Sequence, residues 1–66
     1  SARDIRDKMK EYMDNGVRLG WFLNAKAKEV EVYRAGRDVE VLKSPVSLSG
    51  EDVLPGFVLS LEGILP

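Results

Sequence analysis

The sequence predicts an α+β fold: one N-terminal amphipathic helix, a three-stranded antiparallel meander and an apolar C-terminal tail. Apolar residues first recur at helical spacing and then alternate with polar residues in shorter segments. Proline and glycine interrupt this alternation after residue 43. The chain of 66 residues is long enough for one small domain or partial domain, which we assign to residues 1–66.

The helix is predicted over residues 2–15. Its apolar side chains recur at helical spacing and share one face, namely Ile5, Met9, Tyr12 and Met13. Charged side chains fall mostly on the other side. Asn15-Gly16 is expected to end the helix, because glycine accepts the left-handed conformation that closes a helix.

Three strands are predicted near residues 19–24, 28–34 and 39–43. The first is a short apolar run with two aromatic residues, which favours a buried strand. In the second, valines point to one face, and Glu29 and Glu31 point to the other, which we expect to be solvent-exposed. Turns are expected at residues 24–27 and 35–38, so the three strands form a meander.

The tail, residues 44–66, has a different pattern. Ser44-Pro45 ends the alternation, and residues 48–52 are polar and prone to turns. Residues 58–61 are predicted to form either a short strand or an apolar arm. Because the tail is apolar, we expect it to fold back on the domain or to dock on another chain.

Composition excludes several chemistries. The chain has no cysteine and no histidine, so disulfides, thiolate metal sites, and Ser–His–Asp and Cys–His catalysis are excluded. The net charge of -1 does not by itself indicate a nucleic-acid partner. No apolar run is long enough to span a membrane. We therefore expect a cytoplasmic protein with no membrane partner.

Lys8 and Tyr12 are the candidate catalytic residues. They lie four residues apart and share one side of the predicted helix. A lysine there can stabilise negative charge developing near a phosphate. The alternative is a surface lysine whose aliphatic stem packs on the tyrosine ring.

Two acidic pairs offer oxygen ligands for magnesium, and both have simpler explanations. Asp4 and Asp7 suit the first turns of a helix, where acids interact favourably with the helix dipole. Glu29 and Glu31 suit the outer face of a strand. We therefore predict no metal site and no cofactor site within this chain.

Four segments together resemble a known family. They are Asp7-Lys8-Met9-Lys10-Glu11-Tyr12, Asn15-Gly16-Val17-Arg18-Leu19-Gly20-Trp21, Val30-Glu31-Val32-Tyr33-Arg34, and residues 48–57 ending in Leu-Pro-Gly-Phe. In this order they resemble the C-terminal portion of the Uma-two putative restriction endonuclease family, within the PD-(D/E)XK nuclease-like superfamily. The resemblance covers nearly the whole chain. The family's usual Asp-Pro turn is replaced here by Asn24-Ala25.

The resemblance implies half of a restriction-endonuclease-like domain. Magnesium is implied only for the full family domain, whose metal-binding Asp and Glu-x-Lys-like strand precede the predicted helix. Lys8, and less directly Tyr12, match family positions near the site. We therefore expect a segment that is catalytically incomplete alone and self-associates. Its expected partners are a second copy or the missing N-terminal half-domain, and DNA by resemblance only.

Two alternatives to this function remain open. The chain is either a small protein-interaction module without nuclease activity or a nuclease active only when a second chain supplies the metal-binding acids.

Overall fold

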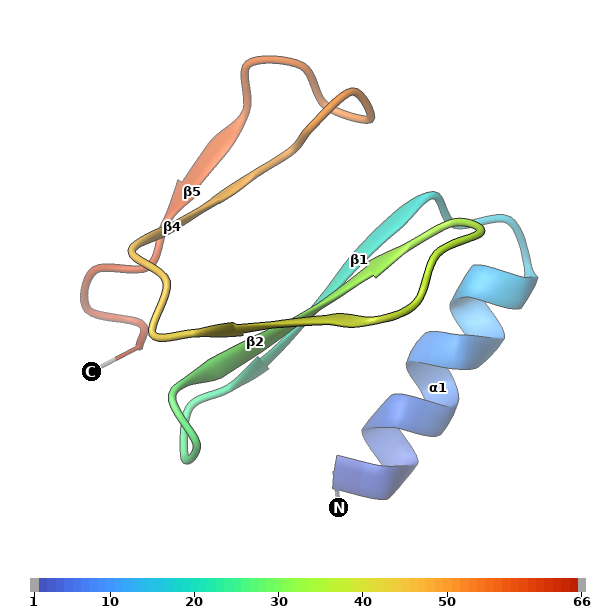
Figure 1. Cartoon of the computed structure of the whole chain (residues 1–66), viewed down its shortest axis with the longest axis horizontal. Coiled ribbons are helices and arrows are strands. Elements are labelled where there is room, and N and C mark those ends of the chain that lie inside the picture. The colour runs from blue at the N-terminus through green and yellow to red at the C-terminus, as the bar shows by residue number, and fades with distance from the viewer. Residues whose placement is uncertain (1, 66) are drawn as a thin grey trace.

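The computed structural model describes residues 2–65 and has the predicted α+β architecture (Figure 1). One helix is followed by a three-stranded antiparallel sheet and a separate two-stranded sheet. The elements in chain order are α1 (Ala2–Asp14), β1 (Leu19–Asn24), β2 (Glu29–Arg34), β3 (Glu40–Lys43), β4 (Ser47–Ser49) and β5 (Val58–Ser60). The predicted helix and first three strands agree with these bounds to within one residue.

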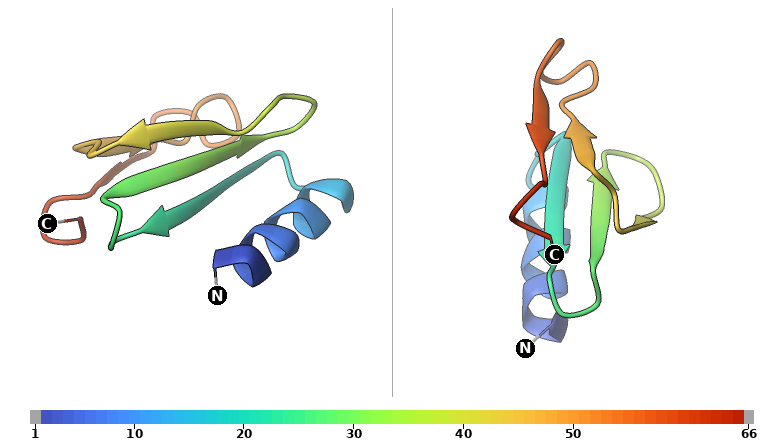
Figure 2. Two further views of the ribbon diagram at one scale, coloured as in Figure 1. Left: turned by 60° about the horizontal axis from the view of Figure 1, so that its bottom comes forward. Right: turned by 90° about the vertical axis from the view of Figure 1, so that its left-hand side faces the viewer.

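The helix ends at Asp14, and Gly16 closes it, as the sequence predicts. Gly16 has a φ of 96°, and its N–H donates to the carbonyl of Met13 at 3.2 Å. The N–H of Val17 donates to the carbonyl of Tyr12 at 3.2 Å. This pair of bonds is a Schellman motif, which satisfies carbonyls at the helix end. It also turns the chain back, so that β1 runs beside α1 (Figure 2).

The three-stranded sheet has the order β1-β2-β3 with continuous antiparallel register. Trp21 pairs with Val32, and Glu31 pairs with both Phe22 and Val41. At the β1–β2 turn, the side-chain oxygen of Asn24 accepts a hydrogen bond from the N–H of Ala27 at 3.2 Å. Asn24 thus stabilises the turn between β1 and β2.

The tail folds back on the sheet, which confirms the first of the two expected arrangements. Residues 58–60 form β5, and the unpredicted strand β4 pairs with it antiparallel. The hydrophobic core lies between the two sheets and consists of Val30, Val32, Leu48 and Leu61, each at most 3% exposed. Partly buried side chains from β1, including Trp21, pack against it.

The two faces of the three-stranded sheet are covered differently. The valine face of β2 packs on the tail, and the Glu31 face carries α1. Of the helix residues 2–14, none is buried, and Ile5 and Tyr12 are 43% and 51% exposed. The predicted apolar helix face therefore packs only in part, through the half-buried Met9 and Met13.

Candidate functional site

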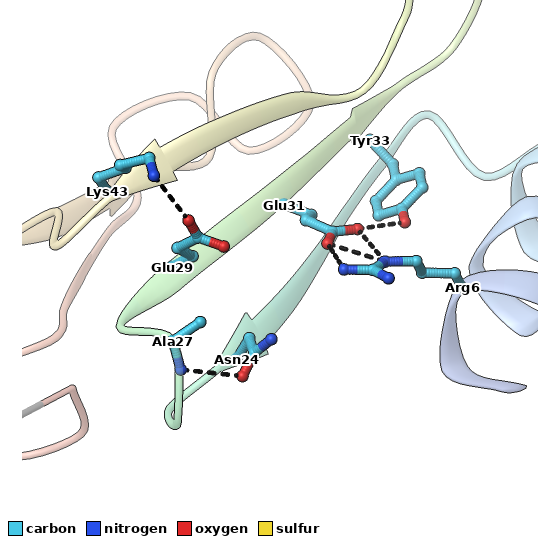
Figure 3. Close-up of polar contacts among 7 residues, drawn as sticks. All are labelled: Arg6, Asn24, Ala27, Glu29, Glu31, Tyr33 and Lys43. Atoms are coloured by element: carbon cyan, nitrogen blue, oxygen red, sulfur yellow. Dashed lines mark hydrogen bonds and ion pairs between the residues drawn. The ribbon is translucent and has the colours of Figure 1, made fainter. Parts of the chain in front are cut away.

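A buried carboxylate lies between α1 and the sheet (Figure 3). Glu31, on β2, is 6% exposed. Arg6, on α1, donates to its Oε2 from Nε at 2.9 Å and from Nη2 at 2.6 Å. The hydroxyl of Tyr33 donates to Oε1 at 2.7 Å. The guanidinium of Arg6 also lies 5.9 Å from the centre of the Phe22 ring, so one arginine contacts two strands.

The charges of this cluster stabilise the ionised carboxylate. The hydrogen bonds from Arg6 lower the pKa of Glu31, and the bond from Tyr33 acts in the same direction against the effect of burial. Burial, and then the neighbouring Glu31 carboxylate, raise the pKa of Tyr33 to about 12. Around neutral pH the cluster therefore consists of a guanidinium, a carboxylate and a neutral phenol.

A second ion-pair cluster joins the end of β2 to the tail. Arg34 donates from Nε to Glu51 Oε2 at 2.9 Å and from Nη1 to Glu40 Oε1 at 2.8 Å. These carboxylates raise the pKa of Arg34, and Arg34 in turn lowers the pKa of Glu51. Glu51 has a φ of 56°, which is an uncommon backbone conformation for a residue other than glycine.

The expectation that Glu31 faces solvent is wrong. The alternation along β2 correctly placed Glu31 on the face of the sheet that does not carry the valines. That face, however, is covered by α1. The predicted inner face of the helix consisted of apolar residues alone and did not include Arg6. Arg6 shares a stripe with Met9 and Met13 at helical spacing, and this is the signal that indicates its inward direction.

Lys8 and Tyr12, the predicted catalytic pair, lie outside both clusters. Both are exposed on α1. On one flank of the helix, Asp7, Lys10 and Asp14 line an open groove of about 550 Å³ that extends to the β2–β3 turn. By helical periodicity, Lys8 and Tyr12 belong to the opposite flank, together with Ile5. Because α1 contacts β1 and β2 but not β3 within residues 2–65, this flank points toward the free edge of β1.

Together these features define an α+β unit in which the Arg6–Glu31 ion pair joins one helix to an antiparallel sheet. The chain belongs to the Uma2 family, described as putative restriction endonuclease, whose model matches residues 1–62. No curated protein matches the chain.

The helix in the described part of the chain is too short and too polar to cross a membrane.

The carboxylates of the sheet do not fit the magnesium site that such a family implies. Both oxygens of Glu31 accept hydrogen bonds from Arg6, and Glu29 pairs with Lys43 at 3.1 Å. Glu40 and Glu51 are bound by Arg34. Within residues 2–65, no three side chains of the metal-binding types His, Cys, Asp and Glu lie together. Magnesium prefers several oxygen ligands that are free to bind it.

Proposed function

We propose that this chain is a structural C-terminal segment of a restriction-endonuclease-like domain, and that it does not cleave DNA alone. In this proposal its helix and sheet complete the core of the domain. The metal-binding acids come from a preceding part of the domain or from a second chain. DNA is the substrate of the assembled domain, by membership of the family.

The pairing of Glu31 is the observation that carries the proposal. A carboxylate that is 6% exposed and held by Arg6 and Tyr33 acts as an anchor for the helix. Releasing it to bind a metal would break the charge-assisted hydrogen bonds that join α1 to the sheet, which costs free energy. A structural role accounts for this cluster without any bound ion.

We further propose that the chain self-associates and that Lys8 lies at the edge of the assembled site. Several large apolar side chains are exposed, including Tyr12 at 51% and Val58 at 62%. Exposed apolar surface of this kind favours association with another protein surface. Lys8 is exposed beside Tyr12, on the flank where added protein would bring acids near its ammonium group.

The direct experiment incubates the purified chain with supercoiled plasmid DNA and Mg²⁺ or Mn²⁺. We expect no nicking above the protein-free control. Lys8→Ala is compared with Lys10→Ala, which removes the same charge from the opposite flank of α1. The proposal would be contradicted if the chain cleaved DNA with a metal, if Lys8→Ala abolished this cleavage, and if Lys10→Ala retained it.

A mixing experiment distinguishes a segment that completes a nuclease domain from a small interaction module that has no part in DNA cleavage. The chain is combined with the N-terminal portion of an Uma2-family domain that carries the metal-binding acids. Metal-dependent cleavage by the mixture, and by neither part alone, is expected. Tight association without any cleavage would instead favour an interaction module.

A further inference from the structure

The Asn15-Gly16 dipeptide that closes α1 carries a chemistry of its own. Asn15 and Asn24 are the two asparagines of the sequence, which has no glutamine, and Asn15 is the one followed by glycine. In such a dipeptide the backbone nitrogen of the glycine can attack the side-chain carbonyl carbon of the asparagine. Glycine has no Cβ to hinder this approach. Asn24 is followed by alanine, whose Cβ hinders the same attack.

The reaction requires water and neither an oxidant nor a reductant. The glycine nitrogen loses its proton and bonds to the side-chain carbonyl carbon, and the side-chain nitrogen leaves as ammonia. Water then adds to the resulting cyclic imide and opens it at either carbonyl. The product is an aspartate, or an isoaspartate in which the main chain runs through the side-chain carbons and is longer by a methylene group.

In the folded chain, hydrogen bonds of the helix end engage both reacting groups. The N–H of Gly16 donates to the carbonyl of Met13 at 3.2 Å. The side-chain nitrogen of Asn15 donates to the carbonyl of Glu11 at 2.8 Å, which turns this side chain back along the helix. The glycine nitrogen must lose its proton, and the asparagine side chain must turn toward it, before the two can bond. The reaction therefore requires the helix end to open.

Few contacts oppose this opening. None of residues 2–14 is buried, and the bond from Arg6 to Glu31 holds the first half of α1. Near the end of the helix, the half-buried Met13 lies close to Gly20 on β1. Segments with few buried apolar contacts open locally at a free energy below that of global unfolding. The end of α1 is therefore expected to open while the rest of the chain stays folded.

We propose that Asn15 is a modification site, at which opening of the helix end lets the side-chain amide become a carboxylate that keeps this end loosened. A carboxylate cannot donate, so the bond to the Glu11 carbonyl is lost. Its charge lies beside Asp14 at the helix C-terminus, where the helix dipole disfavours an anion. In the isoaspartate, the longer main chain also disrupts the bonds that Gly16 and Val17 donate. The proposal is independent of any partner and of the proposed function.

The first test measures the rate of ammonia loss at each asparagine. The full chain is kept in mildly alkaline buffer with or without concentrated urea, and peptide mass spectrometry follows Asn15 and Asn24. In urea, Asn15 should react faster than Asn24, and the folded chain should convert Asn15 more slowly by about tenfold or more. Equal rates at Asn15 with and without urea would overturn the role of the helix end. Equal rates at the two asparagines in urea would overturn the assignment of the site.

A pair of variants tests the coupling to helix opening. Met13→Ala removes the contact with β1 near the helix end, and Lys10→Ala shortens an exposed side chain of the same helix. Met13→Ala should speed the reaction of Asn15 in the folded chain and leave its rate in urea unchanged. Lys10→Ala should change neither rate, and equal folded-state rates in the two variants would contradict the coupling.

The wild type provides an independent check of this coupling. Small additions of urea, below the unfolding transition, should raise the hydrogen-exchange rate of the Gly16 amide and the reaction rate of Asn15 by the same factor. A rise in exchange without a rise in the reaction would contradict the proposed order of events.

Matched aspartate variants test the effect of the product. In Asn15→Asp a donated hydrogen bond is lost. In Asn24→Asp the bond from the N–H of Ala27 is retained, because the Asn24 side chain accepts it and a carboxylate also accepts. Both variants change the net charge equally. Amide exchange at Gly16 and Val17 should be faster in Asn15→Asp and unchanged in Asn24→Asp, whereas equal exchange in the two variants would overturn the loosening.

Discussion

Glu31 is the residue that ties the helix to the sheet. Its carboxylate accepts hydrogen bonds from Arg6 on α1 and from Tyr33 on its own strand. Since none of residues 2–14 is buried, apolar contacts alone hold α1 weakly. The ion pair therefore does much to fix the position of α1 on the sheet. It also orients the flank of the helix that carries Lys8.

Replacement of Arg6 by alanine should destabilise the fold. The change leaves a carboxylate that is 6% exposed with only the Tyr33 hydroxyl as partner. We expect a lower free energy of unfolding than in the wild type, measured by urea denaturation. Replacing both partners, Arg6→Met with Glu31→Met, should cost less than Arg6→Ala alone, because no buried charge remains. A double variant at least as unstable as Arg6→Ala would contradict this account.

The cluster also predicts how stability depends on pH. The pKa of Glu31 is lowered by folding, so its contribution is present above the unfolded value and is lost as pH falls through the folded value. The pKa of Tyr33 is raised to about 12, so its contribution is present below about pH 10 and is lost as pH rises toward 12. Urea midpoints measured across pH should fall at both ends. Tyr33→Phe should weaken the alkaline fall, and an unchanged alkaline limb would contradict the assignment.

At the scale of single elements, local signals in the sequence predicted most boundaries. Asn15-Gly16 ended the helix because glycine alone accepts a φ of 96° readily. Alternation of Val30 and Val32 with polar residues located β2. The strand β4 was missed because Ser47–Ser49 is only three residues long. Its pairing with β5 depends on contacts that neither segment shows alone.

Substitution of two glycines by alanine should destabilise the fold to different extents. A Cβ on Gly50 would lie 2.6 Å from the carbonyl oxygen of Leu54, which is backbone and cannot easily move. A Cβ on Gly20 would lie 2.8 Å from the terminal methyl of Met9, which can rotate away. Gly50→Ala should therefore cost about 1–3 kcal/mol in unfolding free energy, and Gly20→Ala distinctly less. Urea denaturation of the two variants checks the order, and the reverse order would contradict the explanation that a fixed backbone oxygen limits Gly50 and a rotatable methyl limits Gly20.

At the scale of the whole molecule, the tail is part of the core. The sequence indicated an apolar tail but not its position, because fold-back and docking on another chain require the same composition. The contact of Leu48 and Leu61 with Val30 and Val32 decides between them. The candidate site was predicted less well, since the Arg6–Glu31 pair joins residues 25 positions apart in the chain. No local pattern contains such a pair.

Truncation of Leu61 tests the role of the tail. Leu61 is 1% exposed, and alanine there removes buried contacts from both sheets. We expect a loss of about 2–5 kcal/mol, comparable to the whole stability of a domain of this size. Thermal unfolding followed by circular dichroism should show a largely unfolded chain at room temperature. Ile64→Ala, at a side chain that is 48% exposed, is the control and should melt close to the wild type.

Manganese binding tests the central claim most directly, namely that the acids of this chain anchor its own helix and sheet. Paramagnetic broadening of backbone amide signals is recorded while Mn²⁺ is added to the isolated chain. We predict weak, unselective broadening at exposed acids and none centred on Glu29 or Glu31. Selective broadening around Glu31 at substoichiometric Mn²⁺, lost in Glu31→Gln, would contradict the account, because it would make that carboxylate a metal ligand.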